Sequence, residues 1–167
     1  MELVFYIAGA VAIAATLMML IELNAVHALL YLVVSLLAVA IIFYTLGAPF
    51  AAALEVIIYA GAIMVLFVFV LMLLNLGRAA IETERMWLSA ISWTGPFILV
   101  AVLVAEFVYL LHESAGGAYP AVIRPAQVGN ALFGPYVLGV ELASMLLLGG
   151  LVGAYHLGRR APLHPEA

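Results

Sequence analysis

Long apolar runs separated by a few polar residues dominate the pattern along the chain. The first uncharged run lies between Glu2 and Glu22, and no Asp, Glu, Lys or Arg occurs from Leu23 to Leu54. A membrane-crossing helix needs about 20 apolar residues, so the second run is too long for one crossing, and Gly47-Ala48-Pro49 divides it at a turn. The pattern predicts an all-α integral membrane protein with five transmembrane helices, at about 3–21, 27–46, 50–76, 89–111 and 134–157.

Between the last two predicted helices lies the one loop of any size, at about 112–133. Gly116-Gly117, Pro120 and Pro125 argue against a further helix in it. Pro135 suits the first turn of the last helix, because a proline there loses no helical hydrogen bond. We therefore expect a single membrane domain over residues 1–167, with no soluble domain.

The composition supports the membrane assignment and excludes several chemistries. The chain is 69% hydrophobic and 8% charged, whereas soluble domains are about 25% charged. It contains no Asp, Lys or Cys, so phosphorylated-aspartate intermediates, lysine Schiff bases and thiolate chemistry are impossible. No nucleotide-binding loop, metal-ligand spacing or nucleophile–base pair is present either. We expect no catalytic centre, no metal, no cofactor and no nucleic-acid partner in this chain.

The arginines predict how the chain is oriented, since short cytoplasmic loops carry the excess of positive charge. Four arginines lie on one predicted side, in the 77–88 loop and the C-terminal tail, whereas Arg124 alone lies on the other. Five spans place the two termini on opposite sides. The N-terminus is therefore predicted outside, in the periplasm, and the C-terminus in the cytoplasm.

Three carboxylates fall within predicted spans, where ionisable groups are costly and often functional. Glu55 and Glu141 lie about one and a half turns inside their helices, and Tyr59 follows Glu55 by one turn on the same face. One interpretation is a hydrated proton-conducting patch. The other is that each carboxylate is interfacial, or is kept neutral by a hydrogen bond. Glu106 is close enough to its helix end that we expect it to reach the interface.

A patch of small residues, Gly61 between Ala60 and Ala62, lies in the middle of the third predicted helix. Small residues let a neighbouring helix approach closely. Glycine also weakens a helix by about 1 kcal/mol relative to alanine, so the same patch favours a local wide turn, and such π-bulges are common at functional sites. Periodicity alone does not decide between close packing and a bulge.

Four stretches carry a family resemblance. The stretch from Leu54 to Val70, LEVIIYAGAIMVLFVFV, resembles the third-helix signature of the J-type membrane subunit of respiratory complex I, the proton-translocating NADH:quinone oxidoreductase. Its mitochondrial counterpart is NADH dehydrogenase subunit 6. Weaker matches of the same family are Val26 to Tyr31, Phe133 to Tyr136 and Val140 to Leu147. Glu106 is not part of the family pattern.

The resemblance implies a noncatalytic subunit that couples quinone reduction to proton translocation. Its third helix would carry a π-bulge around Tyr59 to Val65 and open or close a hydrated axis. Glu55, Tyr59 and Glu141 would belong to the proton path, and the twisting part of the helix would include Gly61, Met64, Val65 and Phe67.

The resemblance also implies where the chain works. FMN, iron–sulfur clusters and quinone would reside in other subunits of the parent complex. The partners would be the quinone-site subunit, the small A-type and K-type subunits and the antiporter-like subunits, within the lipid bilayer. The expected location is the bacterial plasma (inner) membrane, as a multi-pass protein. Two alternatives stay open: a purely structural subunit of the same complex, and a small independent proton or solute transporter.

Overall fold

The computed structural model describes residues 1–73, 90–114 and 122–159, and every regular element in these ranges is helical. Five helices are long and apolar enough to cross a membrane, which confirms the predicted five-span, all-α architecture. They are Glu2–Ile21, Ala25–Thr45, Pro49–Leu73, Trp93–His112 and Val137–Gly158. The predicted helix ends at 76 and 89 and three of the orienting arginines (Arg78, Arg85 and Arg160) lie outside the described residues, and the orientation of the termini stays a prediction.

The chain divides into two compact units, Met1–Ile123 and Arg124–Ala167, and each is described by itself. The single-domain organisation therefore stays a prediction. The elements of the first unit are α1 (Glu2–Ile21), α2 (Ala25–Thr45), α3 (Pro49–Leu54), η1 (Glu55–Ile63), α4 (Met64–Leu73) and α6 (Ala90–Ser114). The second unit contains α7 (Pro125–Leu132) and α8 (Val137–Gly158).

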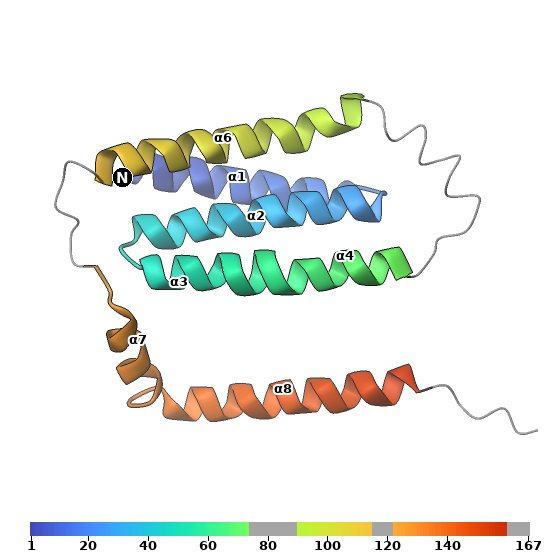
Figure 1. Cartoon of the computed structure of the whole chain (residues 1–167), viewed down its shortest axis with the longest axis vertical. Helices are drawn as coiled ribbons and strands as arrows, with labels where there is room; N and C mark the ends of the chain where they lie inside the picture. The colour runs from blue at the N-terminus through green and yellow to red at the C-terminus, as the bar shows by residue number, and fades with distance from the viewer. Residues whose placement is uncertain (74–89, 115–121, 160–167) are drawn as a thin grey trace, which may run out of the picture. The chain divides into compact units, whose positions relative to one another are not determined.

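Helix α2 is the central element of the first unit. It packs against α1, against the helix built from α3, η1 and α4, and against α6 (Figure 1). The α1–α2 pair is tightly joined at small residues, because Ala8 and Ala15 of α1 and Ala38 of α2 are fully buried. Leu103 and Leu110 of α6 complete this apolar core. Burial of small side chains lets the backbones approach closely, as is typical of helices in membranes.

The turn between α1 and α2 is set by Asn24. Its Oδ1 accepts hydrogen bonds from the backbone N–H groups of Val26 and His27, at 2.8 and 3.2 Å, so it caps the start of α2. The carboxylate of Glu22 accepts from the Asn24 N–H at 3.2 Å. This cap satisfies donors that would otherwise be unpaired at the helix start.

Helix α6 is fixed against α2 near the start of both helices. The His27 ring meets the Trp93 ring edge to face, with centroids 5.8 Å apart. One turn further along α2, the buried Tyr31 hydroxyl lies against Gly95, in the space that a side chain at Gly95 would need. The glycine therefore permits the close contact between α2 and α6.

The second unit corrects two sequence expectations. Residues 125–132 form helix α7, so the prediction of no further helix in the 112–133 loop is wrong. Pro125 stands at the first turn, where proline is favoured, and the Arg124 N–H donates to the Gln127 side chain at 2.8 Å. The last helix begins at Val137 rather than at 134. Gly134 lies in the turn before it, where a Cβ would come within 2.7 Å of the Asn130 carbonyl oxygen.

Candidate functional site

The third span, Pro49–Leu73, changes its helical geometry part-way along its length. Residues Glu55–Ile63 form a π-helix between the α-helical segments α3 and α4, which lie on one continuous helix in Figure 1. At the end of this segment the Met64 N–H reaches the Tyr59 carbonyl, five residues earlier. The π-bulge expected in this helix is thus present. The resemblance implied a bulge around Tyr59 to Val65. The observed π-helix begins four residues earlier, at Glu55, and ends two residues earlier, at Ile63.

Gly61 lies inside the π-helical segment. A Cβ added there would lie 3.2 Å from the carbonyl oxygen of Val56, five residues earlier, which is tighter than nine in ten real Cβ contacts. In a wide turn the residue five positions back lies close by, because the hydrogen bonds link residues five apart. The absence of a side chain at Gly61 therefore avoids a tight contact with the Val56 carbonyl oxygen.

Glu55 and Tyr59 both lie in the π-helical segment. The Glu55 side chain is partly buried, whereas Tyr59 is 48% exposed within the chain. Tyr59 follows Glu55 by four residues within this segment. About half of Tyr59 is left uncovered by the chain itself.

The other residues predicted for the twisting part do not share one environment. Met64 is 2% exposed and is packed inside the first unit, whereas Val65 and Phe67 are 65% and 52% exposed. Met64 is thus the fixed inner contact of the third span just after the π-helix. A rotation of α4 would replace Met64 at that inner position with another side chain.

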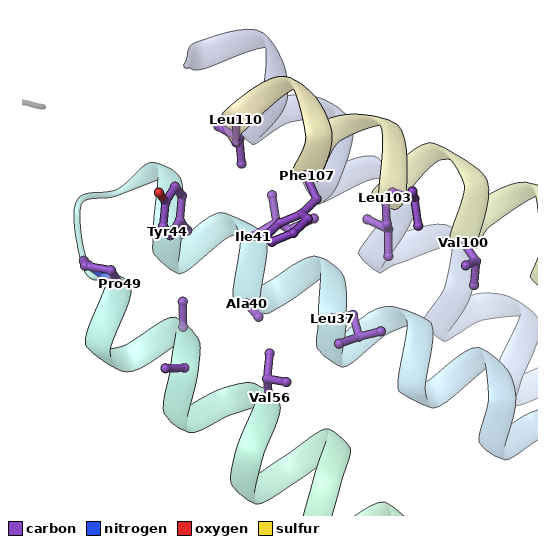
Figure 2. A pocket seen from close by; sticks show the side chains of 13 residues that line it. Leu37, Ala40, Ile41, Tyr44, Pro49, Val56, Val100, Leu103, Phe107 and Leu110 are labelled. Atoms are coloured by element: carbon purple, nitrogen blue, oxygen red, sulfur yellow. The ribbon is translucent and has the colours of Figure 1, made fainter. Parts of the chain in front are cut away.

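An apolar groove separates the third span from α6. It encloses about 440 Å³, and in Figure 2 Val56 of the third span and Phe107 of α6 approach α2 from opposite sides. Neither Glu55 nor Glu106 is among its lining residues. The residues that line it are Leu37, Ala40, Ile41, Tyr44, Pro49, Ala52, Ala53, Val56, Val100, Leu103, Val104, Phe107 and Leu110. Two of the three predicted carboxylates therefore lie outside the groove between their helices.

The third carboxylate, Glu141, belongs to α8 in the second unit. It is exposed there, and its backbone carbonyl accepts a hydrogen bond from the Ser144 hydroxyl at 2.7 Å. Its place in a proton path stays a prediction, as do those of Glu55 and Tyr59.

Glu106 corrects an expectation. It was expected to reach the interface, but its side chain is only 6% exposed. It lies on the face of α6 that carries Leu103 and Leu110, both in the apolar core. Helical position alone did not reveal this, because a residue six positions before His112 is interfacial or buried depending on which face it occupies.

Sequence reasoning also missed a polar contact between the first two spans. The hydroxyls of Thr16 and Ser35 are 2.9 Å apart, and both lie within hydrogen-bond distance of the Ala12 carbonyl oxygen, at 2.8 and 3.2 Å. The signal was available, since hydroxyl residues in apolar spans commonly join helices. This contact stabilises the α1–α2 pair rather than forming a reactive centre.

The described residues define a class of protein. They form a multi-pass helical membrane protein whose third span carries a π-helical segment with one carboxylate and one tyrosine. No group of three His, Asp or Glu side chains able to hold a metal ion occurs within residues 1–73, 90–114 and 122–159.

Comparison with known proteins identifies the family. The model of the NADH-ubiquinone/plastoquinone oxidoreductase chain 6 family matches residues 15–157. The NADH-quinone oxidoreductase subunit J of Pseudomonas aeruginosa is 56% identical over 162 residues, covering 96% of this chain and 98% of the relative. The Escherichia coli K12 protein of the same name is 58% identical over 160 residues, covering 95% and 87%. The chain belongs to the NADH-ubiquinone/plastoquinone oxidoreductase chain 6 family, as its third-helix motif indicated.

Proposed function

We propose that this chain is subunit J of a proton-pumping NADH:quinone oxidoreductase, and that its third span gates a hydrated axis for protons. The family match over most of the chain and the names of its relatives support the first part. The π-helical segment Glu55–Ile63 is the observation that carries the second part.

A π-helical segment supplies a simple means of gating. Each α-helical residue advances the helix by about 100°, since one turn holds 3.6 residues. When such a segment gives up its extra residue and becomes α-helical, everything beyond it turns by about that angle. Met64 would leave its buried position, and exposed apolar residues such as Val65 would take new positions along the axis. A helix with two such settings can convert a small shift into an open or closed water path.

The polar residues have distinct roles in this proposal. Tyr59 supplies the hydroxyl that contacts water on the axis, and Glu55 lies beside the path. Gly61 permits the wide turn, and Phe67 moves with the twisting part. Glu141 contributes a further carboxylate from α8.

The remaining assignments follow from membership in the complex. We propose that electron transfer through FMN, iron–sulfur clusters and quinone takes place in other subunits. The neighbours of this chain are the quinone-site subunit, the small A-type and K-type subunits and the antiporter-like subunits. The chain lies in the bacterial plasma membrane with its N-terminus in the periplasm and its C-terminus in the cytoplasm.

Replacing Tyr59 with phenylalanine tests the gate at its polar contact. We expect proton pumping driven by NADH to fall by about fivefold, because one net hydrogen bond contributes about 1 kcal/mol. Assembly should be unaffected, since the side chain is half exposed and the ring is retained. The measurements are quinone-reductase activity and proton uptake in membrane vesicles.

Tyr6→Phe is the matched control for that experiment. Tyr6 lies on α1 and is 72% exposed. The substitution therefore also removes one tyrosine hydroxyl, but at a position outside the proposed path. If the Tyr59→Phe variant pumped as many protons as the Tyr6→Phe variant, Tyr59 would have no role in gating.

A purely structural role is the second candidate, in which the chain serves only to hold its neighbours together. The first unit is itself held by contacts between its helices. Thr16 binds Ser35, and Tyr31 packs against Gly95. If the chain only holds its neighbours together, Glu55→Gln and Tyr59→Phe will both be silent, whereas Gly61→Leu will abolish assembly. Under the gating proposal the first two variants assemble normally but pump less.

A further inference from the structure

Glu106 is a buried carboxyl that the proposed gate does not use. It is 6% exposed, and neither of its oxygens has a hydrogen-bond partner among the described residues. It lies six residues before His112, about 9 Å inside the end of the span at 1.5 Å per residue. Buried polar groups are nearly always paired, so an unpaired carboxyl at this depth needs a physical explanation.

The surroundings of Glu106 are apolar on the face where it lies. Leu103 and Leu110, three residues before it and four after it, are 5% and 2% exposed. Residues at these spacings lie on one helical face. Both leucines belong to the core that α6 shares with Val4 and Ala8 of α1 and Ile41 of α2.

Among the described residues, no Lys or Arg lies beside Glu106 to balance a charge at this position. The described residues of the first unit include no Lys or Arg at all. None of the titratable groups on the packed elements is bonded to Glu106. These groups are the Met1 amino group, Glu2, Tyr6 and Glu22 from α1 and its end, His27, Tyr31 and Tyr44 from α2, and Tyr109 and His112 on α6 itself.

An ionised carboxylate cannot persist in such a place. Moving an isolated charge from water into a low-dielectric interior has a large free-energy cost, and an apolar interior offers no interaction that offsets it. The group becomes neutral instead. Partner subunits cannot supply the missing cation, because both oxygens are inaccessible while α6 is packed. We propose that Glu106 is a proton-binding site of the first unit, which carries its proton while α6 packs against α1 and α2 and releases it when α6 leaves this packing.

This inference rests on α6 and is independent of the third-span gate. Proton binding and the packing of α6 are thermodynamically linked. The packed form of α6 binds the proton on Glu106, and the form with an exposed carboxyl does not. Packing of α6 is therefore complete at low pH and is lost as pH rises through the ionisation of the carboxyl. An uncharged residue at this position would remove that dependence.

Infrared difference spectroscopy of the purified complex tests the protonation state directly. At neutral pH, the spectrum of wild type minus Glu106→Gln should contain the carbonyl band of one protonated carboxylic acid. Glu2→Gln is the control, because Glu2 is exposed and its loss should remove carboxylate bands only. A spectrum in which Glu106→Gln also removes only carboxylate bands would overturn the proposal.

Hydrogen exchange of α6 peptides tests the coupling. In the wild type, protection of α6 should decrease at alkaline pH relative to Glu106→Gln measured at the same pH; equal protection throughout would overturn the coupling. Glu106→Met is the second variant, since apolar replacement of a buried polar group is often neutral or stabilising. Failure of both variants to assemble would also overturn the proposal, because it would mean that the site requires a charge.

Discussion

Replacing Gly61 with alanine is expected to lower proton pumping by about fivefold, the change that a penalty of about 1 kcal/mol on the π-helical form would produce. The penalty would come from the added Cβ, which would lie 3.2 Å from the Val56 carbonyl oxygen in that form. The variant would therefore move the third span away from the wide turn. Proton uptake per NADH oxidised, measured in vesicles with the assembled complex, gives the result.

Gly9→Ala provides the matched control for Gly61→Ala. Gly9 lies in α1, and a Cβ there meets nothing within 4 Å in the chain. It introduces the same methyl group and the same helix preference in a regular span, so pumping should be retained. The gating role of the π-helix would be refuted if Gly61→Ala pumped as well as Gly9→Ala.

Replacing Gly95 with alanine is expected to destabilise the first unit by about 1–3 kcal/mol, the usual cost of overpacking a core. The new Cβ would overlap the Tyr31 hydroxyl oxygen, and the ring carbon that bears this oxygen would be 3.3 Å away. Tyr31 is buried and has little room to move. The thermal midpoint at which the chain leaves the purified complex should fall.

The double variant Tyr31→Phe/Gly95→Ala makes this prediction specific. Removing the hydroxyl deletes the atom with the worst overlap, so the double variant should recover part of the lost stability. If Tyr31→Phe gave no rescue, or if Gly95→Ala matched wild type, the contact between α2 and α6 would not be the close fit described.

The apolar runs predicted the five spans within a few residues, because hydrophobic length determines what can cross a membrane. The turn at Gly47 was likewise visible: this glycine adopts a φ of 78°, which other residues rarely do. The π-helix was one of two interpretations of Gly61 until the family motif favoured it. Its start at Glu55 was not predicted, since no side-chain pattern marks where hydrogen bonds shift by one residue.

The errors arose where tertiary contacts decide the outcome. Pro125 was read as a helix breaker, although it begins α7. Glu106 was expected at the interface, because its depth was counted along the helix without knowing which face packs against α1 and α2. The close contact at Gly95 was invisible for the same reason: Tyr31 lies on another helix.

The π-helix that precedes α4 offers an explanation for the composition of α4. A helix that turns about its own axis presents each side to lipid in one setting and to protein in another. Every side of α4 must therefore suit both surroundings. The ten residues from Met64 to Leu73, MVLFVFVLML, include no polar side chain on any side. The absence of amphipathicity in this segment would allow the proposed rotation without placing a polar group in hydrocarbon.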